Sequence, residues 1–414
     1  MVGRVNGSGV EPRFDVERLR ARVPALASGV AFFDGPGGTQ TPDLVADAIR
    51  ASLIAPLSNR GTVTESERNA EAIVQGARIA VADLLACDPA GVAFSRSMTE
   101  AAFMVARTLA ADWGPGDRIV VTDLDHDADV RPWVTYAERT GAQVVWARVD
   151  PSTGELPVEN VISAIDNNTR LVAVSGASNV LGTRPDIPTI AAAAHSAGAL
   201  LFVDGVHLTA HSSVDVARLG ADFYACSSYK FLGPHLGIVV ASPALWESMH
   251  PDKLAPSPER VPERFELGTL PYEMLAGVTA AVDVLADLVP GDEASMPRRD
   301  RLVRSMRALE DYEGRLHEHL RSGLETLPGI TLYCNAVVRT PTEFFSFAGH
   351  DSTQVSRELT VRGINAPAGS FYAYEPCRSL GLGATGALRA GLAPYTNGDD
   401  VERLITALRD IVTA

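Results

Sequence analysis

Short apolar runs alternate with helical segments through the middle of the chain, from about residue 91 to residue 242. Runs rich in β-branched residues predict strands, and the amphipathic segments between them predict helices. Strands are expected at 92–95, 118–122, 143–148, 170–175, 200–204, 223–227 and 237–241, with helices at 99–110, 131–140, 157–165 and 189–196. Because this alternation is typical of βαβ units, we predict an α/β fold with a mostly parallel sheet of seven-stranded type, covered by helices on both faces.

The pattern changes after a proline-rich stretch at 251–262. We expect an apolar helix at 272–288, a long charged amphipathic helix at 298–327, weaker strands at 331–333 and 343–347, and a last helix at 398–412. This indicates a smaller α+β domain, as expected for a chain too long for one core. We therefore divide the chain into a flexible tail (1–14), a segment packing on the small domain (15–30), a large domain (31–269) and a small domain with a long interdomain helix (270–414).

Composition limits the partners of the protein. The 36 Lys and Arg residues against 51 Asp and Glu residues give a net charge of −15, which argues against nucleic acid and against an anionic membrane surface. The most apolar stretch, 187–203, is interrupted by Pro188 and His195 and predicts a buried helix followed by a strand. No signal peptide is visible, and the four cysteines are widely spaced, so we expect a cytoplasmic protein with reduced thiols.

Only two lysines occur among the 414 residues, Lys230 and Lys253. Most lysines are solvated surface charges. Lys230, however, follows a predicted buried strand and stands among apolar, aromatic and hydroxylated residues. A desolvated amine loses basicity and becomes a nucleophile toward carbonyl groups, so Lys230 is a candidate Schiff-base lysine.

Three further candidates follow predicted strands, where ligands bind in parallel sheets. Asp204 ends a buried strand and could cap a helix or hold a cationic ring nitrogen. The turn at 95–100 offers Ser97 and Thr99 at a helix N-terminus, which favours a phosphate group but also suits ordinary capping. His126 lies in an aspartate-rich loop that lacks the glycine and glutamate of a calcium loop, and its ring could stack on a cofactor or lie in solvent.

Together these signals form a recognisable series. Seven blocks occur in a fixed order, at 95–100, 125–133, 178–183, 203–205, 227–234, 264–269 and 388–395. The series resembles cysteine desulfurases and, more broadly, the class V aminotransferase group of pyridoxal-phosphate enzymes with the aspartate-aminotransferase-type fold. The resemblance extends from about Phe33 to the C-terminus.

The resemblance implies a pyridoxal 5'-phosphate cofactor and a role for each matching residue. Lys230 would form the Schiff base and move the Cα proton, Asp204 would pair with the pyridinium nitrogen, and His126 would stack on the ring. The phosphate group would be bound by Ser97, Met98, Thr99, Ser227 and Tyr229 and, from the partner subunit of a homodimer, by Thr269. Arg389 would bind the substrate carboxylate, and Asn179 would lie near both this carboxylate and the phenolic oxygen of the cofactor.

The sequence departs from the desulfurase pattern at the reactive loop. Tyr372 occupies the place of the nucleophilic cysteine, and Cys377 follows five residues later, where a free cysteine is most often a small core residue. His207 replaces a glutamine and could still hydrogen-bond the phenolic oxygen of the cofactor. Tyr372, with Phe371 and Tyr374, either shapes the substrate pocket or packs in the small domain.

Two other motifs suggest different functions. The GxGxxG pattern at 381–386 would indicate a dinucleotide site, but no strand signal precedes it, because 373–379 is expected to be a loop. His317 and His319 would point to different faces of a helix, which does not suit a metal site. A non-catalytic binding protein would not need Lys230 and Asp204 together with the other matching residues.

We therefore predict an enzyme that uses pyridoxal phosphate and acts on a small amino-acid substrate. A lyase that breaks a C–S or related bond by β-elimination is our first interpretation. The alternatives are a class V aminotransferase and an amino-acid epimerase, since both also move the Cα proton.

Overall fold

The computed structural model describes residues 13–291 and 295–414, and its largest element is a seven-stranded sheet. The strands lie in the order β2-β8-β7-β6-β5-β3-β4. Their bounds are β2 Val92–Ser95, β3 Arg118–Thr122, β4 Gln143–Ala147, β5 Thr169–Ser175, β6 Leu200–Asp204, β7 Phe223–Ser227 and β8 Gly237–Ala241. All neighbours pair in parallel except at β8, which is antiparallel to both β2 and β7. The predicted α/β fold with a mostly parallel sheet is confirmed.

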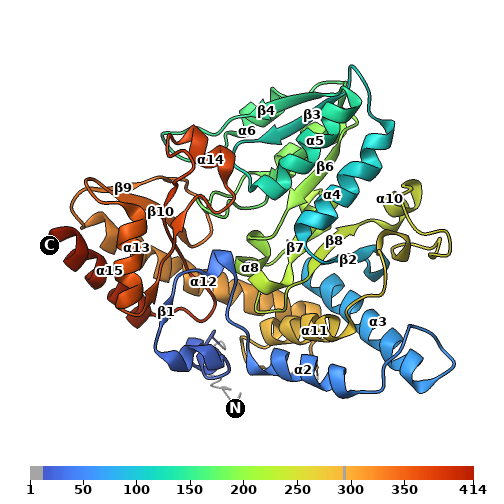
Figure 1. Cartoon of the computed structure of the whole chain (residues 1–414), viewed down its shortest axis with the longest axis horizontal. Coiled ribbons are helices and arrows are strands. Elements are labelled where there is room, and N and C mark those ends of the chain that lie inside the picture. The colour runs from blue at the N-terminus through green and yellow to red at the C-terminus, as the bar shows by residue number, and fades with distance from the viewer. Residues whose placement is uncertain (1–12, 292–294) are drawn as a thin grey trace, which may run out of the picture.

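Helices cover both faces of this sheet (Figure 1). Because side chains alternate along each strand, Ala93 and Phe202 pack on one face while Phe94 and Val203 pack on the other. The first face meets α4 (Met98–Leu109), α5 (Arg131–Thr140) and α10 (Pro243–Ser248), and the second meets α3 (Glu65–Leu85), α7 (Ile187–Ser196) and α11 (Tyr272–Ala286). Helix α2 (Asp43–Ile54) lies outside α11, and the short helices α6 (Val158–Ile162), α8 (Leu208–His211) and α9 (Val216–Leu219) follow strands β4 and β6.

A second, smaller sheet has its own hydrophobic core. Its strands lie in the order β12-β13-β10-β9 and are β9 Ile330–Leu332, β10 Thr342–Phe347, β12 Ala368–Gly369 and β13 Ala387–Gly391. Helices α12 (Arg298–Glu325), α13 (Ser352–Val361) and α15 (Gly398–Thr413) pack against it. Strand β1 (Ala31–Phe32) pairs in parallel with β11 (Ile364–Asn365), which ties the N-terminal segment after α1 (Val16–Arg20) to this part of the chain.

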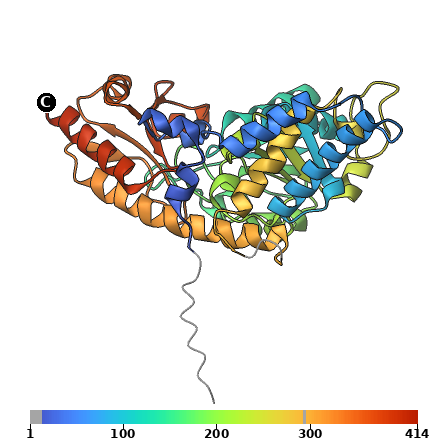
Figure 2. The same ribbon diagram turned by 90° about the horizontal axis from the view of Figure 1, so that it is seen from below.

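The 28-residue helix α12 joins the two sheets (Figure 2). It contacts α3, α8 and α11 beside the large sheet and α15 beside the small one. The cavity described below has walls from both parts.

One local expectation is wrong. Residues 374–379, expected to be part of a loop, form helix α14 (Tyr374–Ser379). Pro376 does not prevent this helix, because it lies in the first turn, where backbone N–H groups have no helical partner. The expected flexible tail falls largely on residues 1–12, which lie outside the described residues.

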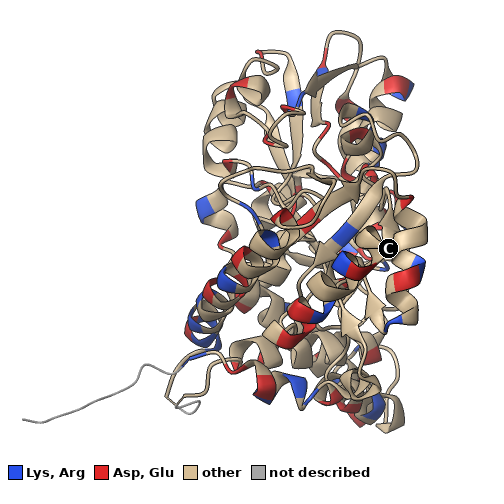
Figure 3. Cartoon of the chain, turned by 90° about the vertical axis from the view of Figure 1, so that its left-hand side faces the viewer, with Lys and Arg blue, Asp and Glu red and all other residues tan. Residues whose placement is uncertain are grey.

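Charged residues of both signs occur along the ribbon. On the side shown in Figure 3, positions of acidic and basic residues alternate along the helices. Among the described helices, none combines the length and the apolar character needed to cross a lipid bilayer.

Candidate active site

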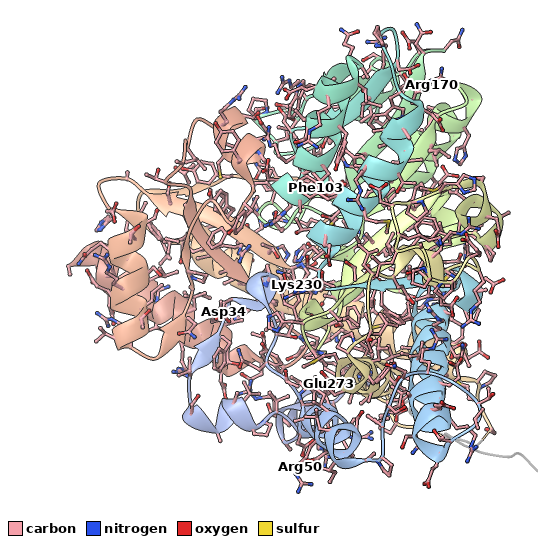
Figure 4. The ribbon with its side chains drawn as sticks, turned by 45° about the vertical axis from the view of Figure 1, so that its right-hand side comes forward. Asp34, Arg50, Phe103, Arg170, Lys230 and Glu273 are labelled. Atoms are coloured by element: carbon pink, nitrogen blue, oxygen red, sulfur yellow. The ribbon has the colours of Figure 1, made fainter. Side chains whose placement is uncertain are left out.

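A cavity of about 670 Å³ lies where the carboxyl ends of β5, β6 and β7 meet the loops of the small sheet. Parallel strands end on the same side of a sheet, which brings distant residues together there. Of the thirteen candidate residues, the twelve that line this cavity are Ser97, Met98, Thr99, His126, Asn179, Asp204, His207, Ser227, Tyr229, Lys230, Tyr372 and Arg389. In Figure 4, Lys230 lies between the two parts of the molecule.

Lys230 stands on a short 3-10 turn directly after β7. Its Nζ donates a hydrogen bond to the carbonyl of Pro36 and lies 4.9 Å from the centre of the Tyr229 ring. Burial, reinforced by the charge of Arg389, lowers the pKa of the Lys230 amine to about 7. A large fraction of this amine is therefore neutral and nucleophilic near neutral pH.

Asp204 ends β6 and lines the cavity with its carboxyl group. Its Oδ1 accepts a hydrogen bond from the backbone N–H of Val206 at 2.9 Å. Burial raises the pKa of Asp204 to about 6, while the charge of Lys230 opposes that rise. A cationic partner in the cavity would stabilise the carboxylate, since buried carboxylates are costly without one.

The N-terminus of α4 faces the cavity with Ser97, Met98 and Thr99. Ser97 Oγ accepts a hydrogen bond from the N–H of Glu100 at 3.1 Å, which begins the helix at this point. Gly237 on β8 lies so close that a Cβ there would be 2.1 Å from the Ser97 carbonyl carbon. The turn is thus fixed against the sheet, with free N–H groups and a helix dipole that favour an anion.

His126 forms another wall of the cavity. Its Nδ1 accepts a hydrogen bond from the N–H of Ala128 at 3.0 Å. Burial, together with the charge of Lys230, lowers the pKa of His126 to about 4, so the ring is neutral at physiological pH. A neutral flat ring is suited to stacking on an aromatic ligand.

Arg389 lies on β13 and is 2% exposed. Its Nη1 donates to the carbonyl of Asn179 at 3.1 Å, and its guanidinium carbon lies 3.8 Å from the centre of the Phe371 ring. Burial lowers the pKa of Arg389 to about 9, and the charge of Asp34 opposes that shift. The group is cationic at neutral pH and can bind a carboxylate.

The loop that carries Phe371 and Tyr372 is fastened over the cavity. The Phe371 carbonyl accepts a hydrogen bond from Asn179 Nδ2 at 3.0 Å, and the Tyr372 carbonyl accepts one from the N–H of Asp127 at 2.8 Å. The φ angles of Phe371 and Tyr372 are positive, 54° and 57°, a backbone conformation that is unfavourable for residues other than glycine. The Tyr372 ring is 77% exposed and lies 5.5 Å from the His126 ring, so it forms an outer edge of the site.

Thr269 is the one candidate outside this cavity. It lies beside a separate hollow lined by Phe94, Arg96 and Leu267, and Leu267 is 58% exposed. The side chain of Glu266 holds this segment in place, because it accepts hydrogen bonds from the Phe94 N–H at 3.0 Å and from Arg78 at 2.7 Å.

Sequence reasoning did not single out several other residues that line the cavity, among them Pro36, Gly37, Phe103, Arg131 and Ser175. Ser175 could have been found, because it is the last residue of a predicted strand. Arg131 contacts Asp127 at 2.7 Å and Glu375 on α14 at 3.4 Å. No sequence signal indicated Pro36 and Gly37, which come from the N-terminal segment.

Neither competing motif forms the structure it would need. The GxGxxG pattern at 381–386 follows helix α14 rather than a strand. His317 contacts Glu343 at 2.8 Å while His319 contacts Glu402 at 2.7 Å, so the two rings have different partners.

The residues present fit pyridoxal phosphate. An amine, a buried carboxyl group, a neutral imidazole and a helix N-terminus surround one cavity, and they match the aldehyde, pyridine nitrogen, ring face and phosphate group of that molecule. Asn179 Oδ1 and Arg389 Nε are buried without a hydrogen-bond partner among the described residues, and both side chains line the cavity. Such atoms can receive polar groups of a ligand.

Comparisons with known proteins agree with this donor set. The family model of class V aminotransferases matches residues 31–404. The chain is 32% identical to the uncharacterized protein MT3887 of Mycobacterium tuberculosis, covering 96% of this chain and 99% of that one, and 30% identical to a cysteine desulfurase of Salmonella agona, covering 96% and 98%. The structure is similar to that of the cysteine desulfurase CsdA of Escherichia coli, with a TM-score of 0.84, 28% identity and coverage of 97% and 98%.

Proposed function

Because the chain belongs to the class V aminotransferase family and is a pyridoxal-phosphate-dependent enzyme, we propose that it is a lyase acting on an amino-acid substrate. The reaction is a β-elimination that breaks a C–S or related bond at the substrate's Cβ. Bound pyridoxal phosphate supplies a protonated ring that accepts the electron pair released at Cα. The protein then has to hold the substrate, move one proton and let a leaving group depart.

Four residues hold and orient the ligands in this proposal. Asp204 would keep the pyridine nitrogen of the cofactor protonated, and His126 would stack on its ring. Arg389 binds the substrate carboxylate through two parallel hydrogen bonds, next to Asn179. This fixed carboxylate decides which Cα bond stands perpendicular to the ring.

Lys230 moves the proton. With a pKa lowered to about 7, its amine can take the proton from Cα and return one to the leaving group. The Cα–H electron pair becomes the Cα=Cβ double bond, and the Cβ–S pair leaves with sulfur as a thiol. Water completes the reaction, which releases a 2-oxo acid and ammonia.

The absence of a usable thiol is the observation that carries the proposal. None of the described residues lining the cavity is a cysteine, and Tyr372 stands at the loop position. Cys377 is fully buried, its Sγ lies 4.0 Å from the Ser370 carbonyl, and burial raises the pKa of its thiol to about 11. A buried protonated thiol is a poor nucleophile, whereas elimination needs no protein nucleophile other than Lys230.

A panel of amino acids tests this proposal. The holoenzyme is incubated in deuterium oxide with cysteine, S-substituted cysteines, alanine and glutamate, and Lys230→Ala is the inactive control. We expect pyruvate and thiol in equal amounts from the cysteine derivatives. Accumulation of pyridoxamine phosphate without pyruvate would instead identify an aminotransferase, and deuterium at Cα with inverted configuration an epimerase.

We also propose that the enzyme is a homodimer in which Thr269 binds the phosphate group in the partner's cavity. Thr269 is exposed, lies outside its own cavity and follows the exposed Leu267. The clamp made by Glu266 holds that segment rigidly enough to serve a neighbouring site.

A further inference from the structure

A line of buried ionisable side chains leads away from the cavity at His207. His207 precedes α8, His211 is the last residue of α8, and Glu313 lies on α12. Their exposed fractions are 3%, 4% and 1%. The ring centres of His207 and His211 are 4.8 Å apart, and His211 Nδ1 lies 2.8 Å from Glu313 Oε2.

His207 itself faces the cavity and the small sheet rather than Glu313. Its ring lines the cavity, and its Nε2 lies 3.1 Å from the hydroxyl oxygen of Thr342 on β10. The two imidazole rings meet edge to face at 73°, without a hydrogen bond in the described structure. Glu313 can therefore influence His207 through the charge on His211, but not by direct contact.

The surroundings of Glu313 favour a charged pair with His211. A buried carboxylate is stable only with a close partner, and Glu313 Oε1 has no hydrogen-bond partner among the described residues. Burial raises the pKa of Glu313, and the imidazoles of His211 and His317 oppose that rise, while Glu310 is bound to Arg184 at 2.6 Å. A proton on His211 thus converts an isolated buried charge into a hydrogen-bonded ion pair.

The surroundings of His207 disfavour a second proton on its ring. Burial is the main cause, and the charges of His211, Lys230 and Arg389, which lie on different elements, act in the same direction. Asp204 accepts a hydrogen bond from Val206. Burial and these cations hold the pKa of His207 well below its usual range.

We propose that the Glu313–His211 pair carries a proton beside His207 and so keeps the His207 ring neutral in the cofactor cavity. Glu313 and His211 are then positioning residues for a site that neither of them lines. The inference concerns charge states in the protein itself. Only the effect of these charge states on the cofactor rests on the proposed function, in which His207 hydrogen-bonds the phenolic oxygen of the cofactor.

Nuclear magnetic resonance of ¹⁵N-labelled histidine tests the inference on the full chain without cofactor. The sequence has nine histidines, and His211→Asn and His207→Asn assign the two signals. At pH 7 we expect both ring nitrogens of His211 to be protonated but only one of His207. A singly protonated His211 in the wild-type protein would overturn the inference, even if no variant folds.

Glu313→Gln keeps the shape of the side chain and removes its charge. We expect His211 to lose one ring proton at pH 7, while Glu318→Gln, on the exposed face of the same helix, leaves the signal unchanged. An His211 that stays doubly protonated in Glu313→Gln would contradict the inference.

The absorbance of bound cofactor separates the inference from the proposed function. In Glu313→Gln, His211 is expected to lose its positive charge near the phenolic oxygen of the cofactor. The pH at which the absorbance of the bound cofactor is half changed should therefore rise by half a unit or more. If the nuclear magnetic resonance result is as expected and this pH does not move, the inference stands and the proposed orientation of the cofactor is wrong.

Discussion

Lys230 depends on its surroundings for its reactivity. Its amine is buried and lies near the cationic Arg389, and both features favour the neutral form, while the charge of Asp204 opposes them. Lys253, the other lysine, makes an ion pair with the exposed Glu259 at 2.7 Å. The two lysines therefore differ in chemistry although they share a side chain.

We predict that cofactor loading is controlled by the pKa of Lys230 near 7. Only the neutral amine attacks an aldehyde, so the loading rate of the cofactor-free protein should rise about tenfold per pH unit below pH 7 and level off above about pH 8. Stopped-flow absorbance measures the rate. Borohydride reduction followed by peptide mapping should place the pyridoxyl group on Lys230, and equal labelling of Lys253 would refute the assignment.

Other residues were predictable to different degrees. Lys230 and Asp204 follow strands that the sequence marks clearly, so physical reasoning found both. Arg389 and Asn179 were found only through motif resemblance. Glu313 had no signal at all, because nothing in an amphipathic helix says which distant side chain will meet it.

At the scale of elements, helix ends determine both stability and binding. Ser97 caps α4 at the cavity, and Thr64 caps α3 far from it through a reciprocal capping box with Glu67. Each cap satisfies N–H groups that the helix cannot. The two helices differ in that only the N-terminus of α4 faces the cavity.

We predict that Ser97→Ala and Thr64→Ala have similar effects on stability but different effects on cofactor binding. Each should lower the free energy of unfolding by about 1 kcal/mol, as cap removal usually does. Only Ser97→Ala should also weaken pyridoxal phosphate binding, because the hydroxyl is a phosphate donor in the proposed site. Urea unfolding and fluorescence titration measure the two effects. Equal cofactor affinity in both variants would exclude Ser97 from the phosphate site.

The prediction of helices and strands was accurate where apolar residues recur at regular spacing and poor where they do not. Strands β2, β3, β6, β7 and β8 have the expected bounds, because β-branched runs mark a buried strand. Helices α2, α3 and α13 were not anticipated, and α14 was expected to be a loop. Helix α14 has only six residues, which is too short for a periodic signal.

At the scale of the whole molecule, the proposed shared site makes a distinctive prediction. Lys230→Ala and a bulky Thr269→Trp variant should each be inactive as homodimers. When the two are unfolded together and refolded, half of the dimers are hybrids with one complete cavity, so about a quarter of wild-type activity should return. Activity assays on the mixture and on each variant refolded alone measure this. No recovery in a mixture that forms hybrid dimers would refute the contribution of Thr269.

The sequence by itself determined the α/β class, most of the strand positions in the large sheet, the single credible Schiff-base lysine and the order of the motifs along the chain. These follow from local patterns, since burial is recorded in the spacing of apolar residues. Only the tertiary structure decided that Pro36 meets Lys230 across 194 residues and that Glu313 meets His211 across 102. Such contacts depend on the order of the strands in the large sheet and on the packing of α12 against the helices beside it. That packing is a property of the whole fold, so no local pattern encodes it.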